Sequence, residues 1–308
     1  MSYRLENGRT YHKFKDGSEV SAPPLMLHIV STLYLILSRC ADIQHHMLLI
    51  TFDNQLGTAP LNHKHKPIRV GRVLDIGTGT GSWAIEFGDE HPEAEVLGVD
   101  LSAIQPEFTP PNVKFEIADV EEPWTYSRPF QYIHSRMMNG SIRHWETYLK
   151  NCYDYLTPNG YIELTECDFK AKSDDGTLTD DLALVELLRM WAEAAAELGQ
   201  PFREIEPLVD VLREIGFVDV EVRMEKWPSN PWPRDRKLRE LGFWNLENFT
   251  KGIEGFVMAP LTRAFNWSHE EVVAFADQVC REMRGPRIHY YTPVWSIHGR
   301  KPAKTQFE

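Results

Sequence analysis

One short stretch of the sequence combines an acidic residue with three closely spaced glycines. It runs Arg-Val-Leu-Asp-Ile-Gly-Thr-Gly-Thr-Gly-Ser-Trp over residues 72–83. Val73, Leu74 and Ile76 form a short apolar run next to turn residues, which predicts a buried strand. The glycines let the backbone turn sharply and approach a ligand with no Cβ in between. Because a helical pattern begins at Ser82, the free N–H groups of a helix start would face this turn and form an anion site.

A second acidic residue follows at the end of the next predicted strand. Residues 96–99 are Val-Leu-Gly-Val, and Asp100 comes directly after them. An acid at this place can accept hydrogen bonds from both hydroxyls of an adenosine ribose, as in the dinucleotide fold. A dinucleotide fingerprint would run Gly-x-Gly-x-x-Gly, but here the third glycine comes one residue early and Asp75 precedes the first. An NAD site, or a glycine-rich turn that only packs, are the alternatives to a site for a different nucleoside.

These residues resemble the first motif of the class I S-adenosylmethionine (SAM) methyltransferases, acid-x-Gly-x-Gly-x-Gly. The resemblance implies SAM as the cofactor, with its methionine part against the backbone of residues 77–81 and its ribose on Asp100. It also implies an acid or amide near the adenine amine, for which Asp119 at the end of the third predicted strand is the candidate. The cofactor-binding residues predicted in this way are Asp75, Gly77, Thr78, Gly79, Gly81, Asp100, Leu101, Asp119, Val120 and His134.

Strands and helices alternate along the middle of the chain. Strands are predicted at 72–76, 95–100, 113–117, 130–134, 161–166 and 218–222, with helices at about 141–155 and 206–215 and a turn at 157–160. A last strand at 290–299 is antiparallel in the methyltransferases that the motif resembles. The alternation is typical of a parallel sheet covered on both faces. We therefore predict an α/β fold, a Rossmann-like seven-stranded class I methyltransferase sheet with helical lid insertions.

Two stretches are too long to be simple connections between strands. The first, at about 168–204, contains an amphipathic helix at 180–198, and the second, at about 227–286, contains helical patterns at 235–258 and from the Ser268 cap to about Arg284. We interpret both as lid insertions in a methyltransferase domain at 67–308, after an N-terminal helical or lid segment at 1–66. Such loops on a common scaffold carry substrate specificity.

The composition limits the class of partner and the compartment. The net charge is −12 and no basic block is present, which argues against a nucleic-acid substrate. Four scattered cysteines favour reduced thiols in an intracellular protein. The polar start predicts no signal peptide, and the apolar run 25–37 is shorter than the roughly 20 residues of a membrane span. We expect a cytoplasmic protein, or alternatively a nuclear one, with no membrane segment.

Methyl transfer from SAM mainly requires alignment of the reacting atoms and exclusion of water. No metal-ligand spacing is found in the sequence, so we expect no metal. An oxygen acceptor can need a general base, for which His134 and His289 are the candidates. In the alternative reading, His134 only forms a hydrogen bond at a strand end and His289 only packs. Glu163 and Glu166 on the fifth predicted strand also lie near the expected pocket.

Several further stretches resemble one fungal group, the LaeA-like methyltransferases, which includes regulators of secondary metabolism and tailoring enzymes of biosynthetic clusters. The stretches are 6–12, 92–102, 104–106, 111–116, 140–142, 158–163 and 288–293. Residues 20–41 depart from the group, because they are apolar where a polar, acid-rich stretch is expected. A variant helix and a translated intron both explain this departure.

The resemblance implies a SAM-dependent methyltransferase that acts on oxygen or nitrogen of a small molecule, in fungal secondary metabolite biosynthesis. One alternative is a LaeA-like regulatory protein that binds SAM and controls secondary metabolism through protein partners. Another is a SAM-binding fold recruited to non-methyl chemistry, such as a pericyclic rearrangement. An enzyme of the first kind releases S-adenosylhomocysteine only with its cognate compound, whereas the third kind releases none.

Overall fold

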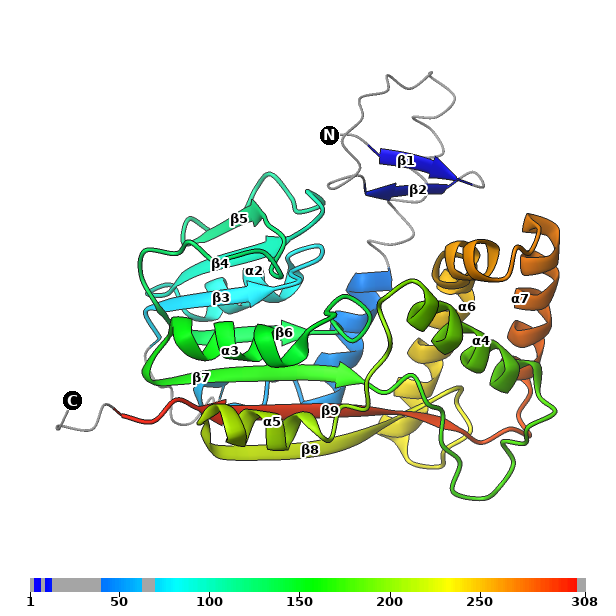
Figure 1. Cartoon of the computed structure of the whole chain (residues 1–308). Coiled ribbons are helices and arrows are strands. Elements are labelled where there is room, and N and C mark those ends of the chain that lie inside the picture. The colour runs from blue at the N-terminus through cyan, green and yellow to red at the C-terminus, as the bar shows by residue number, and fades with distance from the viewer. Residues whose placement is uncertain (1–2, 7–8, 13–39, 63–69, 304–308) are drawn as a thin grey trace.

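Seven strands form one sheet at the centre of the molecule, in the order β5-β4-β3-β6-β7-β9-β8 (Figure 1). The computed structural model describes residues 3–6, 9–12, 40–62 and 70–303, with side chains from residue 40 onward. Strand β9 runs antiparallel to β7 and β8, and the other neighbours are parallel. The predicted Rossmann-like sheet is therefore confirmed, including its antiparallel last strand. The strands are β3 (Arg72–Ile76), β4 (Glu95–Asp100), β5 (Val113–Ile117), β6 (Phe130–Arg136), β7 (Leu156–Cys167), β8 (Val218–Pro228) and β9 (Tyr291–Arg300).

The first three strands have the predicted bounds, the next three are longer than predicted, and the last is shifted by one residue. The turn predicted at 157–160 does not separate two elements, because these residues belong to β7, although the register with β6 shifts there. Asn159 adopts a left-handed φ of 62° there, and its N–H donates to the carbonyl oxygen of Lys301 at 2.9 Å. Strand β8 continues to Pro228 instead of ending at residue 222, because it pairs along the whole length of β9.

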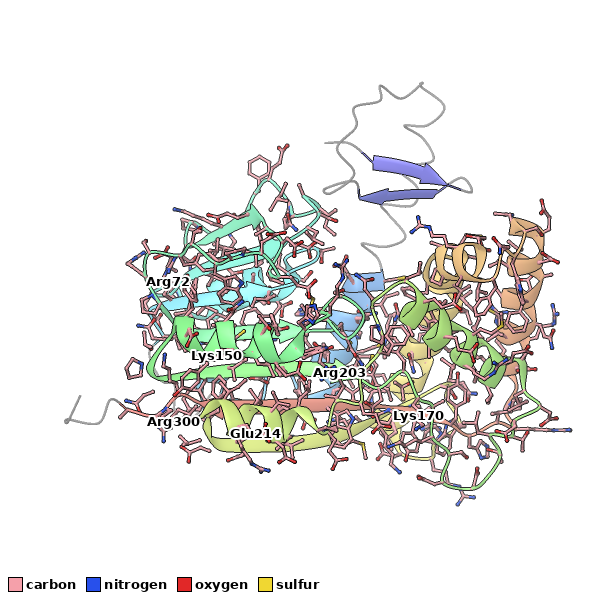
Figure 2. The ribbon with its side chains drawn as sticks, viewed as in Figure 1. Arg72, Lys150, Lys170, Arg203, Glu214 and Arg300 are labelled. Atoms are coloured by element: carbon pink, nitrogen blue, oxygen red, sulfur yellow. The ribbon has the colours of Figure 1, made fainter. Side chains whose placement is uncertain are left out.

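Helices cover both faces of the sheet. On one face, α3 (Trp145–Tyr155) and α5 (Leu208–Ile215) pack on a cluster that contains Leu74. On the other face, α2 (Ser82–Glu90) packs on a cluster that contains Val73. Neighbouring residues of β3 thus enter opposite cores, as the period of two in a strand requires. Charged side chains such as Lys150 on α3 and Glu214 on α5 lie on the outer faces of these helices (Figure 2).

The predicted lid insertions contain three helices that pack on one another. They are α4 (Ala183–Glu197), α6 (Arg236–Ala264) and α7 (His269–Arg284), which share an apolar cluster. The group lies beyond the carboxyl ends of β6 and β7 (Figure 1). The predicted cap of α7 is present, because the Ser268 hydroxyl accepts the N–H of Glu271 and the Glu271 carboxylate accepts the N–H of Ser268.

A helix over residues 40–51 lies between the sheet and the lid helices. Its Met47 and Leu48 share an apolar cluster with Trp227 of β8. The chain that follows it is held by Glu163 of β7, whose carboxylate accepts the N–H groups of Thr58 and Ala59 and the hydroxyl of Tyr132. Residues 40–62 are therefore packed into the sheet domain.

The remaining parts of the N-terminal segment lie largely outside the described residues. The predicted boundary at 66–67 falls in the undescribed stretch 63–69, and residues 20–39 of the unusual apolar stretch are also outside. An antiparallel pair of short strands, β1 (Tyr3–Glu6) and β2 (Arg9–His12), is described by its backbone.

Candidate active site

The glycine turn follows β3 and leads into α2, as the sequence predicts. The N–H groups of Gly77 and Thr78 donate to the carbonyl oxygen of Val99 at the end of β4, at 2.9 and 3.0 Å. Gly77, Gly79 and Gly81 all have a left-handed φ, of 67°, 57° and 82°, which strongly favours glycine. A Cβ at Gly77 would collide with the sulfur of Met138, whereas a Cβ at Gly79 would meet no protein atom within 4 Å. The backbone at Gly79 thus faces open space, which suits a ligand that approaches closely.

Three predicted cofactor residues meet beneath this turn. Asp75 accepts a hydrogen bond from the Thr78 hydroxyl at 2.5 Å with one oxygen and pairs with Nδ1 of His134 at 2.7 Å with the other. The carboxylate and the imidazole are both almost fully buried. The His134 ring also stacks on Trp83 of α2, with 3.7 Å between ring centroids. These side chains hold the turn in place from inside the core.

Asp100 lies at the end of β4, next to the turn. Its two oxygens accept the N–H groups of Gly79 and Ser102, each at 2.9 Å. Burial raises the pKa of the Asp100 carboxyl, and the two backbone N–H groups counteract part of this rise because they favour the ionised form. An ionised carboxylate has further lone pairs that can accept two ribose hydroxyls. Leu101, the predicted neighbour of the cofactor, is exposed beside it.

Asp119 and Val120 follow β5, at the outer end of the same edge. One oxygen of Asp119 accepts the N–H of Glu121 at 3.0 Å, and Val120 is buried in the core beneath. The predicted cofactor residues therefore lie along the carboxyl ends of four adjacent strands, β5, β4, β3 and β6. Ligands of open α/β sheets bind at this edge, so these residues are placed where an elongated nucleoside would lie.

Helix 40–51 contributes charged residues that sequence reasoning missed. One oxygen of Asp42 accepts the hydroxyl hydrogens of Thr80 and Ser82, at 2.8 and 3.1 Å. On the next turn of the same helix, Nδ1 of His45 contacts the guanidinium of Arg136 at 2.9 Å. Burial lowers the pKa of Arg136, and the nearby acids, first Asp75, counteract the shift.

Asp42 and Arg136 carry opposite charges, which bears on how the cofactor would bind. An acid that contacts Thr80 and Ser82 and a cation at the end of β6 would suit the ammonium and the carboxylate of the methionine end of SAM. Asp42, Arg136, Gly79 and Asp100 are thus the groups that would hold the cofactor's charged and polar ends. No short motif marks Asp42 or Arg136, because their roles arise from the packing of helix 40–51 on the sheet.

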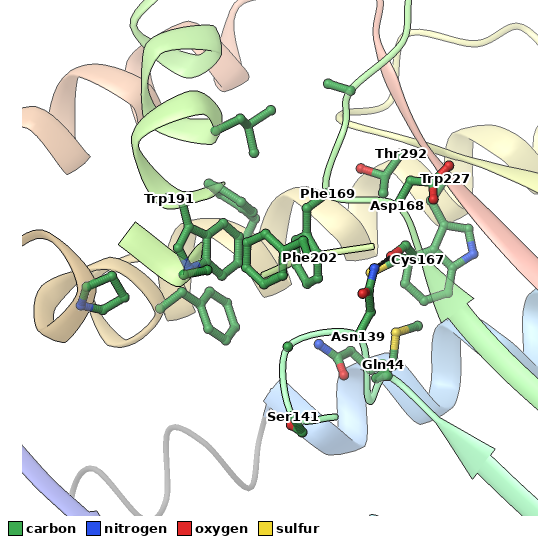
Figure 3. A pocket seen from close by; sticks show the side chains of 18 of the residues that line it. Gln44, Asn139, Ser141, Cys167, Asp168, Phe169, Trp191, Phe202, Trp227 and Thr292 are labelled. Atoms are coloured by element: carbon green, nitrogen blue, oxygen red, sulfur yellow. Dashed lines mark hydrogen bonds between the residues drawn. The ribbon is translucent and has the colours of Figure 1, made fainter. Parts of the chain in front are cut away.

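A cavity of about 520 Å³ lies beside these predicted cofactor residues, between the sheet edge and the lid helices (Figure 3). Aromatic side chains from the lid and from the segment after β7 form much of its wall. Phe169 stacks on Phe202 with centroids 3.9 Å apart, and Trp191 of α4 meets both rings edge-on. Its described lining also includes Gln44, Met137, Asn139, Ser141, Asp168, Trp227, Asn245, Asn248, Phe249 and Phe256. The volume and the apolar wall are typical of a small-molecule site.

The segment 137–141 after β6 joins the cavity to the cofactor turn. Its Met138 lies against Gly77, and its Gly140 lies against Phe202 of the cavity wall. Glu166 of β7 holds this segment, because its carboxylate accepts the N–H groups of Met138 and Asn139, both at 2.9 Å. Burial raises the pKa of Glu166 to about 8.

His289 has other neighbours than His134. Its Nδ1 pairs with Asp175 at 2.6 Å, its Nε2 lies 3.1 Å from the carbonyl oxygen of Pro286, and its ring stacks on Trp232. His289 is not among the residues of the cavity wall. The structure therefore does not bring the two histidines together, and a role of either as a base stays a prediction.

In the part of the chain that the structure describes, no group of three His, Cys, Asp or Glu side chains is placed to hold a metal ion. Within the same part, no helix has both the length and the hydropathy that crossing a membrane requires. The apolar run 25–37 lies outside the described residues.

Comparison with known proteins agrees with this geometry. Residues 44–222 match the family described as methyltransferase domain. Methyltransferase pytC of Aspergillus terreus is 35% identical over 301 residues, which cover 97% of this chain and 88% of that protein. Secondary metabolism regulator LAE1 of Cochliobolus heterostrophus is 33% identical over 313 residues, covering 97% and 94%. Protein-methionine methyltransferase laeA of Emericella nidulans is 30% identical over 308 residues, covering 98% and 77%.

Solved structures show the same fold at low sequence identity. Phosphoethanolamine N-methyltransferase 2 of Haemonchus contortus, in complex with SAM, aligns with a TM-score of 0.50 and 17% identity, covering 95% of this chain and 60% of that one. The cyclopropane synthase MmaA2 of Mycobacterium tuberculosis also has a TM-score of 0.50 and 17% identity, covering 76% and 79%.

Proposed function

Since the chain belongs to the LaeA-like class I SAM-dependent methyltransferases, we propose that it methylates oxygen or nitrogen of a small molecule in fungal secondary metabolite biosynthesis. The observation that carries the proposal is the cavity of about 520 Å³ with an aromatic wall. This cavity adjoins the cofactor turn through segment 137–141, so a molecule in it would lie next to the cofactor's methionine end.

The chain's own contribution to such a reaction is alignment and exclusion of water. Bound SAM supplies a methyl group that its sulfonium already activates. The glycine turn and Asp100 orient the cofactor, and the aromatic wall holds an apolar molecule in a space with little water.

No residue of the described cavity wall is well placed to act as the base that removes a proton from the acceptor. Asp168 is the one carboxyl group of that wall, and its oxygens already accept the N–H groups of Ile205 and of the Trp295 indole. Burial raises the pKa of the neighbouring Cys167 thiol to about 12, so this thiol stays protonated at neutral pH. The geometry therefore favours an acceptor that is already nucleophilic, such as an acidic phenol or a neutral nitrogen.

The proposal is tested with the purified protein, SAM labelled in its methyl group and a panel of aromatic metabolites. Label in a small-molecule product, together with S-adenosylhomocysteine, supports it. Trp191→Ala should lower turnover at least tenfold, because it removes part of the cavity wall. Trp267→Ala is the matched control, since this tryptophan packs on Phe275 in the lid cluster and does not line the cavity. Equal effects of both variants would contradict the assignment of the cavity.

A second candidate function is favoured by one relative named as a regulator of secondary metabolism and another named as a protein methyltransferase. LAE1 and the Emericella nidulans laeA, the latter named a protein-methionine methyltransferase, resemble this chain at 33% and 30% identity. In that case the labelled methyl group would be transferred from SAM to a protein, and a partner protein would co-purify with this chain. The first function predicts a cytoplasmic protein and the second a nuclear one, which a fluorescent fusion distinguishes. Tight SAM binding with a transformed compound and no S-adenosylhomocysteine would instead indicate non-methyl chemistry.

A further inference from the structure

One buried polar side chain of the cavity wall has no hydrogen-bond partner among the described residues. Asn248 lies in the middle of α6, is only 6% exposed, and lines the cavity. Its side-chain oxygen is buried and unpaired among the described residues. A buried polar atom without a partner destabilises a fold, and asparagine also has a low helix propensity.

The other two asparagines and the acid of the wall form hydrogen bonds within the fold itself. Asn139 accepts the N–H of Arg203 and donates to two carbonyl oxygens. Asn245, one turn earlier on α6, donates to the carbonyl oxygen of Pro228. Asp168 accepts two N–H groups. Asn248 differs from all three, because its side chain contributes no such contact to the described structure.

The position of Asn248 relates it to the cofactor side of the cavity. Its backbone carbonyl lies 3.9 Å from the sulfur of Cys40, and Gly252 on the next turn of α6 also packs on this sulfur. Helix 40–51 thus runs against α6 at this point. The same helix carries Gln44 into the cavity and Asp42 onto the cofactor turn (Figure 3).

We propose that Asn248 recognises the acceptor molecule by accepting a hydrogen bond from its hydroxyl or N–H group. The inference rests on the proposed function and names its substrate class: a neutral, flat aromatic molecule that carries such a donor. An uncharged molecule fits this wall, because the described lining holds no lysine, arginine or histidine, and its one carboxyl group, Asp168, is buried and already accepts two N–H groups of the fold. The apolar body would lie against Phe169, Phe202 and Trp191, and the donor would point toward helix 40–51.

The test compares two probes that differ in one hydrogen-bond donor. The protein is loaded with S-adenosylhomocysteine, and the binding of 1-naphthol and of 1-methoxynaphthalene is followed by quenching of tryptophan fluorescence. The unaltered protein should bind 1-naphthol at least fivefold more tightly, because the methyl ether cannot donate. Asn248→Leu should bind both probes equally. Asn245→Leu, a change on the same helix and in the same cavity, should keep the preference.

The outcomes separate this inference from the proposed function. Binding of both probes without preference, or a preference that survives in Asn248→Leu, overturns the role of Asn248 and leaves a small-molecule cavity. Binding of neither probe overturns both proposals. The Tm of the ligand-free protein is a second readout: Asn248→Leu should match or exceed the unaltered protein, since it removes an unpaired polar atom. A lower Tm would show a structural role and overturn the inference.

Discussion

Replacing Gly79 by alanine should weaken SAM binding while the protein remains folded. An added methyl group would meet no protein atom within 4 Å, so packing opposes the change little. The remaining structural cost is the left-handed φ of 57°, which is unfavourable by roughly 1–2 kcal/mol for a residue with a Cβ. For a chain of this length this corresponds to a Tm lower by roughly 2–4 °C. The methyl group would project into the space assigned to the cofactor, so we expect SAM affinity to fall at least about tenfold, or ~1.4 kcal/mol.

Gly176→Ala separates backbone strain from loss of the ligand space. Gly176 has a φ of 73°, and a Cβ added to it would also meet no protein atom within 4 Å, but it lies in the loop after β7, far along the chain from the turn. Isothermal titration calorimetry with SAM and thermal unfolding would be measured for both variants. The Tm values should fall by similar amounts, and only Gly79→Ala should lose affinity. If Gly79→Ala binds SAM as tightly as Gly176→Ala does, the turn does not hold the cofactor.

Three further predictions concern buried acids and a buried histidine. Asp100→Asn should weaken SAM binding by about 10–100-fold in calorimetry, because a charged acceptor of two hydroxyls is lost; an unchanged Kd would exclude the ribose contact. Burial raises the pKa of Glu166 to about 8, above the value of about 4.3 in an unfolded chain. The unfolded chain therefore loses this proton first, and the Glu166 contribution to stability, full below about pH 4, is lost as the pH rises to about 8. Glu166→Gln should accordingly flatten the fall of Tm between pH 5 and 8, and parallel curves would contradict the shifted pKa. His134→Ala should lower stability by roughly 3 kcal/mol in denaturant unfolding, because it removes the pair with Asp75 and the stack on Trp83; an unaltered stability would refute the supporting role.

Local patterns in the sequence predicted the elements that local chemistry decides. The bounds of β3, β4 and β5 follow from short apolar runs between turn residues, and the start of α7 follows from Ser268 and Glu271. The glycine turn was predictable for the same reason, since its left-handed backbone needs glycine whatever surrounds it.

Contacts between distant parts of the chain were not predictable in this way. Glu163 was expected near the pocket, yet its carboxylate accepts N–H groups of Thr58 and Ala59, more than 100 residues away in the sequence. Asp42 and Arg136 escaped notice because isolated charged residues carry no local signal. The turn expected at 157–160 is an irregularity within β7 instead, because the register with β6 shifts between Phe130 and Tyr132 and Asn159 has a left-handed φ of 62°.

Helix 40–51 connects the two halves of the site through residues on different sides of it. Asp42 binds hydroxyls of the cofactor turn, Gln44 lines the cavity, and His45 contacts Arg136. Residues two positions apart on a helix lie on nearly opposite sides, whereas residues three apart share a face. One rigid element therefore touches the turn and the end of β6 with one side and the cavity with another. A displacement of this helix would change cofactor and acceptor contacts together. Specificity for the acceptor is thus expected to depend on the helix as much as on the lid.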